Sequence, residues 1–210
     1  MRAAICREHG QPLVIEEVTL APPGPGQIAV RLAACAICHS DLTYAEGAWG
    51  GSLPAIYGHE AAGHVTALGA GVSGFAPGDA VLVTLITSCG ACPACSGGAP
   101  TSCAHAWDAR PSPLCDASGA TVAQAMATGA FAEAVVVDVS QCVPLPPDLP
   151  LDQASLLACG VITGVGAVFN TAKVPEGATV VVIGAGGIGL NVIQGAALAG
   201  ASRIVAIDLS

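Results

Sequence analysis

Four cysteines lie close together in the stretch SCGACPACSGGAPTSC at residues 88–103. Two residues separate each of the first three and seven precede the fourth, giving Cys89, Cys92, Cys95 and Cys103. A loop rich in Gly and Pro can fold four thiolates around one tetrahedral ion, and zinc fits this set best. An iron–sulfur cluster and a group of free buried thiols are the alternatives. Because four protein ligands leave no open position, a zinc ion here would be structural.

A second set of possible ligands is scattered along the chain. Cys38 lies in AICHSD, His59 and Glu60 lie in YGHEAAG, and Cys159 lies in LLACGVITG. Taken singly, such a histidine is more often a hydrogen-bonded core residue, and such cysteines are more often small buried hydrophobes. Together they supply two thiolates and one imidazole. Three protein ligands with an open position for water or substrate are what a catalytic zinc needs.

A third motif, GAGGIG at residues 184–189, has the spacing of a dinucleotide-binding turn. Gly184 would form the tight turn, Gly186 would admit a pyrophosphate, and Gly189 would let a helix pack on a strand. The following helix N-terminus would face the phosphates. Asp208 comes nineteen residues after the last of these glycines. It is expected to accept hydrogen bonds from the ribose hydroxyls, which favours NAD over NADP.

The elements around this turn follow from the residue pattern at 177–202. This stretch carries no charge over 26 residues and is long enough to cross a bilayer, but it contains seven glycines. The β-branched run Thr179–Ile183 precedes the turn, a helical pattern follows it, and Arg203–Ile207 forms a second apolar run. The pattern predicts a βαβ unit whose strand is buried on both faces.

The chain before this unit has a different texture. Short Val-rich segments at 28–32, 80–85 and 134–139 are separated by Pro and Gly, which predicts an irregular, mostly β domain. The proline cluster PLPPDLP at 144–150 marks its end, so we expect the boundary at 150–165. The predicted fold class is therefore α/β with a mostly β domain.

Composition excludes several classes of function. Six Lys and Arg residues stand against fifteen Asp and Glu, and the formal net charge is −9. This charge repels nucleic acid and the anionic membrane surface, so neither is expected as a partner. The N-terminal MRAAICREHG lacks the apolar core and cleavage site of a signal peptide, which predicts a cytoplasmic protein. In a reducing compartment its cysteines are expected to be ligands rather than disulfides.

The order of these motifs, CHSD, GHE, CGxCxxC with a fourth Cys, ACGVITG and GAGGIG, resembles the zinc-containing alcohol dehydrogenases of the medium-chain dehydrogenase/reductase superfamily. The resemblance covers nearly the whole chain. It implies a GroES-like catalytic domain at 1–158, with a structural zinc lobe at about 88–104, and the first, truncated part of a Rossmann domain at 159–210. It also implies two zinc ions per full-length subunit, NAD, a small-molecule alcohol or aldehyde substrate, and a homodimer or homotetramer.

The resemblance assigns roles around the metal. Cys38, His59 and Cys159 match the catalytic zinc ligands, and Glu60 matches the carboxylate beside the zinc. Asp41 matches the acid that orients the ligand histidine, although a turn or helix cap after CHS would explain the same residue. In the proton relay, Ser40 matches the hydroxyl that takes the alcohol proton.

The end of that relay departs from the family pattern. The best-known animal members carry a histidine five positions after the first zinc cysteine, where this chain has Thr43. Solvent, Thr43 or the cofactor ribose could take the proton instead. Cofactor positions by the same resemblance are His39 near the pyrophosphate, Thr163 and Ile188 near the nicotinamide, and Gly187 in the glycine-rich turn.

The sequence predicts less about the substrate pocket. Trp49 and Leu85 match pocket-lining positions, and ordinary core packing explains them equally well. The predicted function is NAD-linked oxidation of an alcohol to an aldehyde or ketone. The alternatives are a truncated, non-catalytic zinc-binding module and, with less support, the zinc-free quinone-reductase branch, which typically lacks the cysteine lobe.

Overall fold

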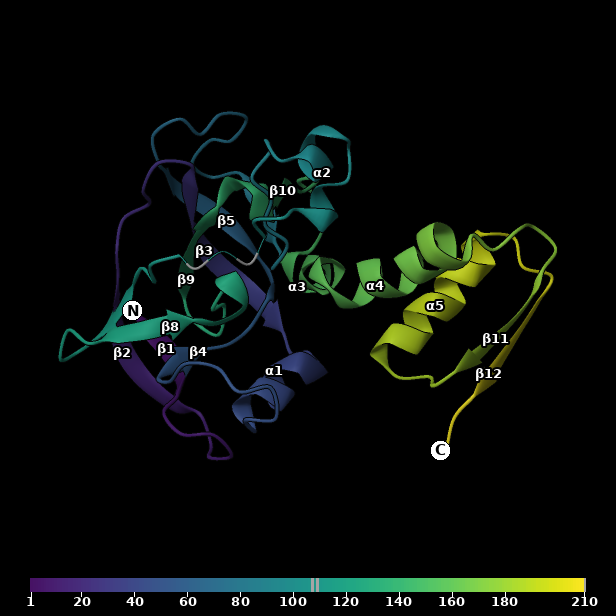
Figure 1. Cartoon of the computed structure of the whole chain (residues 1–210), viewed down its shortest axis with the longest axis horizontal. Helices are drawn as coiled ribbons and strands as arrows, with labels where there is room; N and C mark the ends of the chain where they lie inside the picture. The colour runs from purple at the N-terminus through teal and green to yellow at the C-terminus, as the bar shows by residue number, and fades with distance from the viewer. Residues whose placement is uncertain (107, 109, 210) are drawn as a thin grey trace. The chain divides into compact units, whose positions relative to one another are not determined.

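Val-rich segments separated by Pro and Gly become the strands of a first unit, which runs from Met1 to Leu156 (Figure 1). The computed structural model describes residues 1–106, 108 and 110–209. The strands of this unit are β1 (Arg2–Cys6), β2 (Val14–Leu20), β3 (Gln27–Ala36), β4 (Ala55–Ile56), β5 (Glu60–Leu68), β6 (Ala80–Val83), β7 (Leu114–Asp116), β8 (Thr121–Gln124), β9 (Ala134–Asp138) and β10 (Cys142–Pro144).

These strands form two sheets with separate cores. One sheet closes into a barrel in the order β1-β2-β7-β8-β4, and the other has the order β10-β6-β5-β3-β9. In the second sheet Ile28 and Val30 of β3 are fully buried and pack against Val81 and Val83 of β6. The alternation of buried and outward residues along β3 is what a strand with one covered face requires.

Short helices connect the strands of the first unit. They are α1 (His39–Ala45), α2 (Pro93–Ser96), η1 (Pro100–Ser102), η2 (Ala125–Ala127), η3 (Val139–Gln141) and α3 (Leu151–Ser155). Helix α1 begins just after β3 ends, and α3 lies beside β3 and β5.

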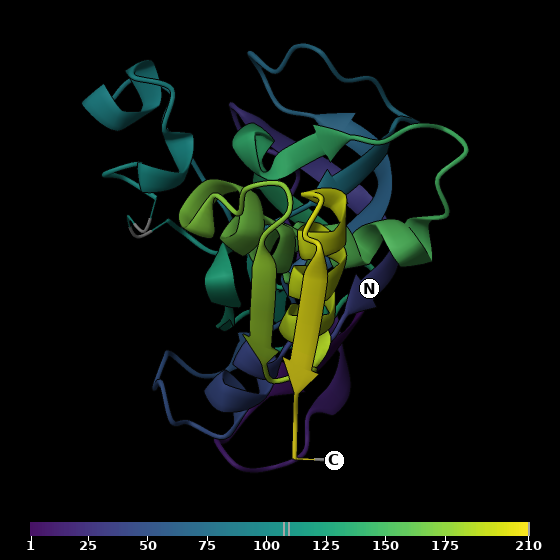
Figure 2. The ribbon, with the colours of Figure 1, turned by 90° about the vertical axis from the view of Figure 1, so that its right-hand side faces the viewer.

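The second unit begins at Leu157 and contains the predicted strand–turn–helix–strand segment. Its elements are η4 (Leu156–Ala158, at the boundary), α4 (Gly160–Gly166), the π-helical η5 (Ala167–Ala172), β11 (Thr179–Ile183), α5 (Gly187–Leu198) and β12 (Arg203–Ile207). Figure 2 shows β11 and β12 side by side in the same direction, with α5 behind them. At Gly189 a side chain would collide with the carbonyl oxygen of Gly184, so the turn and helix can approach this closely only with glycine.

One expectation for this unit is wrong. Strand β11 was expected to be buried on both faces, yet Val181 is 55% exposed and Ile183 is 83% exposed, while Val182 is buried. Helix α5 covers one face of the strand pair, and no element of the described part of this unit covers the other. Alternate residues of a strand point to opposite faces, so only one set is buried.

By its internal contacts the chain divides into two compact units, the first ending at Leu156 and the second beginning at Leu157. The assignment of residues 1–158 to a catalytic domain and of residues 159–210 to a nucleotide-binding domain stays a prediction. Among the described residues, no single helix has the length and apolar character to cross a membrane. One bent pair, Leu151–Ala158 with Gly160–Ala172, meets those criteria by length and composition only.

Candidate active site and metal centres

Helix α1 starts at the first ligand motif because Cys38 is its N-cap residue. The backbone N–H of Cys38 donates to Asp41 Oδ2 at 2.9 Å, and Asp41 is the third residue of the helix. This reciprocal arrangement is a capping box, in which a side chain satisfies a backbone donor at the helix N-terminus. The helix start therefore fixes the backbone that carries the Cys38 thiol.

The second carboxylate oxygen of Asp41 reaches the other ligand motif. Asp41 Oδ1 accepts a hydrogen bond from the N–H of Gly58 at 2.9 Å and lies 3.1 Å from His59 Nδ1. Asp41 and His59 are 2% and 1% exposed, so these bonds lie away from solvent. Asp41 is thus both the helix cap and the partner of His59, two roles that the sequence left as alternatives.

The bond to Asp41 decides which nitrogen of His59 can bind a metal. When Nδ1 donates its proton to a carboxylate, Nε2 keeps a lone pair. Ligand atoms of Cys38, His59 and Glu60 lie within 4.8 Å of one another. A thiol, an imidazole nitrogen and a carboxylate at this separation fit a divalent metal of the zinc type.

Sequence reasoning did not single out Gly58, the residue before His59. Its backbone has φ +91°, in the region that favours glycine. An added Cβ would lie 2.6 Å from Phe131 Cδ1 and 2.7 Å from the backbone nitrogen of Phe131. The tight approach holds the Gly58 N–H on Asp41, and the only sequence signal was a glycine directly before the His-Glu pair.

We expect Gly58→Ala to lower the free energy of unfolding by about 2–4 kcal/mol, since it adds a steric collision to an unfavourable φ. The matched control is Gly119→Ala, at φ +83° with no atom within 4 Å of the added Cβ. The control should cost only about 1–2 kcal/mol, from φ alone. Denaturant unfolding of both variants measures the difference, and equal losses would contradict a special role for the space beside Gly58.

Cys35 lies three residues before Cys38 but has a different environment. Its Sγ donates to the carbonyl oxygen of Ala36 at 3.4 Å, and burial raises the pKa of the Cys35 thiol to about 12. A thiol that stays protonated is a poor metal ligand. Proximity in sequence therefore does not make Cys35 part of the Cys38 group.

The four clustered cysteines converge in space around α2 and η1. All four sulfurs lie within 4.8 Å of one another, with Cys89 and Cys95 at 4.0 Å and Cys92 and Cys103 at 3.9 Å. A tetrahedral ion with metal–sulfur bonds of about 2.3 Å requires sulfur separations of about 3.8 Å. The donor set and its spacing therefore fit one tetrahedral ion rather than thiols dispersed in a core.

Backbone donors also point at these sulfurs. The N–H of Cys92 donates to Cys89 Sγ, and the N–H groups of Cys89 and His105 donate to Cys103 Sγ, each at 3.3 Å. Backbone N–H groups lower the pKa of Cys89, and they lower that of Cys92 to about 6. Such bonds stabilise thiolates, which are the metal-binding form.

Cys95 behaves differently, because desolvation raises its pKa to about 12. Four thiolates at this spacing would repel one another in the absence of a cation. A bound divalent cation removes that repulsion and favours the ionised form of every ligand thiol.

The two ends of this cysteine lobe are attached to residues in or next to η3. Before the lobe, the N–H of Ser88 donates to Ser140 Oγ at 3.0 Å, and after it Arg110 pairs with Asp138 at 2.9 Å. Asp138 also accepts from the backbone N–H of Ser140 at 3.0 Å. Both ends of the lobe are thus held where β9 ends and η3 begins.

The remaining predicted residues of the first unit, apart from Leu85, lie on α1 or shortly after it. Ser40 is partly buried and His39 is exposed. The hydroxyl of Thr43 donates to the His39 carbonyl oxygen at 3.0 Å, so it satisfies its donor within the helix. Trp49 is 58% exposed and meets Tyr44 edge to face, at 5.1 Å between ring centroids, whereas Leu85 is partly buried.

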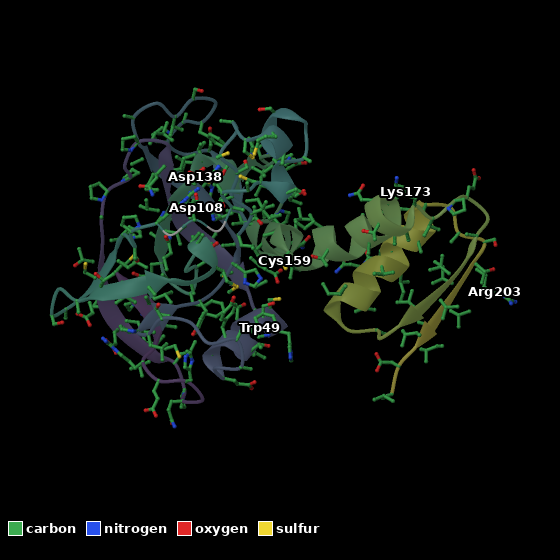
Figure 3. The ribbon with its side chains drawn as sticks, viewed as in Figure 1. Trp49, Asp108, Asp138, Cys159, Lys173 and Arg203 are labelled. Carbon is green, nitrogen blue, oxygen red and sulfur yellow. The ribbon has the colours of Figure 1, made fainter. Side chains whose placement is uncertain are left out.

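The second unit carries the other predicted positions. Cys159 is the N-cap residue of α4, as Figure 3 shows, and its carbonyl oxygen accepts the N–H of Thr163 at 2.9 Å. Ile188 is exposed in the first turn of α5. Asp208 follows β12 and accepts hydrogen bonds from the N–H groups of Ala185 and Leu209, at 2.5 and 2.6 Å.

Comparison with known proteins agrees with this geometry. Residues 24–147 match the model of the alcohol dehydrogenase GroES-like domain. The chain belongs to the alcohol dehydrogenase family of the medium-chain dehydrogenase/reductase superfamily. The predicted family and the predicted fold class, a mostly β GroES-like domain followed by part of a Rossmann domain, are confirmed.

Alcohol dehydrogenases from several organisms are similar over the whole chain. An alcohol dehydrogenase-like 7 of Arabidopsis thaliana and an alcohol dehydrogenase class-3 of Cereibacter sphaeroides are both 40% identical over 100% of the chain. Among solved structures, an alcohol dehydrogenase zinc-binding domain protein from Burkholderia ambifaria has a TM-score of 0.95 at 33% identity. A benzyl alcohol dehydrogenase from Acinetobacter calcoaceticus has 0.90 at 29%, and both matches cover 100% of this chain.

The chain spans somewhat more than half the length of these alcohol dehydrogenases. It covers 56% and 58% of the two curated relatives, and 59% and 58% of the two solved chains.

Proposed function

We propose that the intact protein oxidises an alcohol to an aldehyde or ketone with NAD, using one zinc ion at Cys38, His59 and Cys159 and a structural zinc in the cysteine lobe. The carrying observation is the buried Asp41. It binds the Cys38 backbone and the His59 ring at once, so that a thiol and the Nε2 lone pair converge. A hydrogen bond between a carboxylate and a metal-binding histidine orients that ligand and raises its basicity.

Cys159 is the proposed third ligand. It follows the end of α3 at Ser155 by four residues, which at full extension span at most about 14 Å. Helix α3 packs against β3, whose end precedes Cys38, and against β5, which begins after His59. The chain length therefore supports a position for the Cys159 thiol beside the other two ligands.

The chemistry of the proposed reaction divides between the bound groups and the chain. Zinc, when bound, supplies a Lewis acid that lowers the pKa of an alcohol hydroxyl, and NAD supplies the hydride acceptor. The alcohol loses its hydroxyl proton and its carbon-bound hydrogen leaves as hydride, so alcohol and NAD⁺ give carbonyl compound, NADH and one proton. Ser40, partly buried on α1, is the proposed first acceptor of that proton.

The proton route beyond Ser40 is proposed to lead to solvent. Thr43 donates its hydroxyl hydrogen to the His39 carbonyl, and passing a proton onward would first require that bond to break. His39 is exposed at the start of α1 and is proposed to approach the cofactor pyrophosphate. Because Ser40 is itself only partly buried, a proton on its hydroxyl needs no further side chain to reach water.

The nucleotide is proposed to bind the glycine-rich turn through backbone N–H groups at the start of α5. Strands β11 and β12 are parallel, with Thr179 beside Arg203 and Ile183 beside Ile207. Arg203 therefore lies at the end of the sheet away from Gly184, and so does Lys173, which precedes β11; Figure 3 shows both side chains. Neither basic residue of this unit can reach a 2′-phosphate at Asp208.

We expect the intact enzyme to prefer NAD over NADP by about 100-fold or more in kcat/KM. The Asp208 carboxylate can accept from both ribose hydroxyls, whereas a 2′-phosphate would face its negative charge. Asp208→Ala should narrow the gap by weakening NAD and relieving the repulsion of NADP. Glu176→Ala, the other acidic residue of the unit, is the control and should leave the ratio unchanged. Equal use of both cofactors by the wild type would contradict the role of Asp208.

The test of the proposed function combines metal analysis with turnover. We expect the intact protein to contain two zinc ions per chain and to reduce NAD when an alcohol is added, as followed by NADH absorbance. A chelator that removes one zinc should abolish turnover and leave the fold largely intact. Two zinc ions without turnover on any alcohol would favour a non-catalytic zinc-binding module instead.

The proposal extends to the cellular location and the oligomeric state of the intact protein. All ten cysteines are free thiols in the structure, which is consistent with a reducing, cytoplasmic location. We propose a homodimer or homotetramer for the intact protein, and light scattering after size exclusion measures that state. A monomer would contradict it without affecting the metal sites.

A further inference from the structure

The turn that connects β8 to β9 holds its backbone in an unfavourable conformation. Within it, Met126 has φ +51° and Ala127 has φ +54°. These values lie in the left-handed region, which residues with a Cβ adopt rarely and at a cost in free energy. Two such residues in succession persist only where surrounding contacts hold them. Residues 125–129, the left-handed turn, therefore need partners outside their own backbone.

The side chain of Gln141, on η3, is such a partner. Its Nε2 donates to the carbonyl oxygen of Ala127 at 3.0 Å and to that of Thr84 at 2.8 Å. Its Oε1 accepts a hydrogen bond from the backbone N–H of Asp138 at 3.1 Å. The residue is 1% exposed, so water does not compete for these bonds. Because Nε2 has two hydrogens and Oε1 has none, an amide satisfies all three partners, whereas a carboxylate or an apolar side chain could not.

A second glutamine closes the turn from its beginning. Gln124 donates from Nε2 to the carbonyl oxygen of Thr128 at 3.0 Å and to that of Val136 on β9 at 2.9 Å. These bonds fix the turn to the next strand, whereas Gln141 fixes it to η3 and to Thr84, the residue after β6. Loss of the Gln141 amide should therefore loosen the turn without releasing it.

The junction between β6 and η3 does not depend on the Gln141 side chain. The backbone carbonyl oxygen of Gln141 already accepts the N–H of Thr84 at 3.0 Å. The next residue, Cys142 on β10, pairs with Val83 on β6. The amide is therefore an additional attachment, and its additional partner is the left-handed turn.

The far end of the left-handed turn sets the backbone before His59. The N–H of Ala130, three residues after Ala127, donates to the carbonyl oxygen of Gly58 at 2.9 Å. The Gly58 N–H donates to Asp41 Oδ1 at 2.9 Å, and the same oxygen lies 3.1 Å from His59 Nδ1. A shift of the turn is therefore passed to the groups that orient the His59 ring.

We propose that Gln141 is a positioning residue for the metal ligand His59. Its amide holds the left-handed turn, and the turn holds Gly58 and Asp41 in the arrangement that orients the His59 ring. This inference rests on the proposed function, which places a zinc ion at a site that includes Cys38 and His59. Loss of a group that directly orients a metal ligand costs about 10–100-fold in metal affinity. Gln141 acts through intervening residues, so an effect at the lower end of that range is expected.

The test follows zinc retention by the intact, zinc-loaded protein during titration with a chelator. Cys38→Ser lacks a ligand of the proposed catalytic zinc, so the release step that is missing from this variant identifies that ion, and the remaining step reports the cysteine lobe. Gln141→Met keeps a similar length but has no amide. Its catalytic zinc should leave at about tenfold lower free chelator concentration than in the wild type. Its lobe zinc should stay within about threefold of the wild type, because the Gln141 amide bonds to none of the four lobe cysteines.

A matched variant separates positioning from general loss of stability. Val18→Ala truncates a buried side chain in the core of the barrel sheet, away from the left-handed turn, and should lower the unfolding midpoint while leaving both release steps unchanged. Gln141→Asn is the milder change if the methionine variant does not fold. Its amide is one methylene shorter and cannot keep all three bonds at once, so a shift of about threefold in the same direction is expected.

Ala127→Gly tests the route through the turn. Glycine adopts the left-handed conformation without steric cost, so the turn keeps its shape more readily when the amide is absent. Adding Ala127→Gly to Gln141→Met should therefore recover at least about threefold in zinc retention at the catalytic site.

The outcomes distinguish the inference from the proposed function. Unchanged release of the catalytic zinc from both Gln141 variants would overturn the inference and leave the alcohol dehydrogenase function standing. An equal shift in Val18→Ala at a matched unfolding midpoint, or no recovery on adding Ala127→Gly, would overturn it as well. If the wild type and Cys38→Ser released the same number of zinc ions in the same steps, no zinc would be bound at Cys38, and the proposed function itself would fail.

Discussion

Replacing Cys38 by serine is expected to lower kcat/KM for alcohol oxidation by at least about 1,000-fold, while the protein stays folded. A serine hydroxyl does not supply the thiolate that holds a catalytic zinc, and loss of metal assistance removes several kcal/mol of transition-state stabilisation. Metal analysis should find one zinc ion fewer per chain. The unfolding midpoint should change little, because Asp41 still caps α1 through the Cys38 backbone.

Cys35→Ser is the matched control for this prediction. Its thiol donates to the Ala36 carbonyl, and a serine hydroxyl can make the same hydrogen bond. Zinc content and kcat should therefore stay within a few-fold of the wild type. Loss of zinc from the Cys35 variant, with retention in the Cys38 variant, would show that the wrong cysteine had been assigned.

Replacing Cys92 by serine is expected to act on stability rather than on chemistry. A structural zinc contributes directly to folding, and the lobe at 88–104 has few apolar contacts of its own. We expect the free energy of unfolding to fall by at least about 3 kcal/mol and Tm by about 6–12 °C. One zinc ion should be lost, and limited proteolysis should cut within the lobe.

The control for the lobe is Cys115→Ser, at a partly buried cysteine on β7 outside both ligand groups. It should keep both zinc ions and change Tm by only a few degrees. Turnover per remaining catalytic zinc in the Cys92 variant should be close to that of the wild type. If the Cys92 variant keeps two zinc ions and its stability, the lobe does not hold a metal.

The segment that is predicted to bind a nucleotide shows how much of a structure local sequence pattern can predict. The β-branched runs Thr179–Ile183 and Arg203–Ile207 coincide with β11 and β12, because short-range periodicity and glycine turns determine such elements. The burial of β11 on both faces was wrongly predicted. Which face of a strand is covered depends on elements packed from elsewhere, and these leave no local trace at Val181 or Ile183.

By itself, the sequence determined the ligand types and the compact spacing of the lobe, because four cysteines within one short loop can meet around one ion in almost any fold. It could not decide between a cap and a histidine partner for Asp41, or point to Gly58. Those two residues are seventeen positions apart and meet because the end of β3 pairs with the start of β5, which brings the segment after β3 beside the segment before β5. Contacts between distant segments depend on strand register and on the space left by Phe131, and only the tertiary structure sets these.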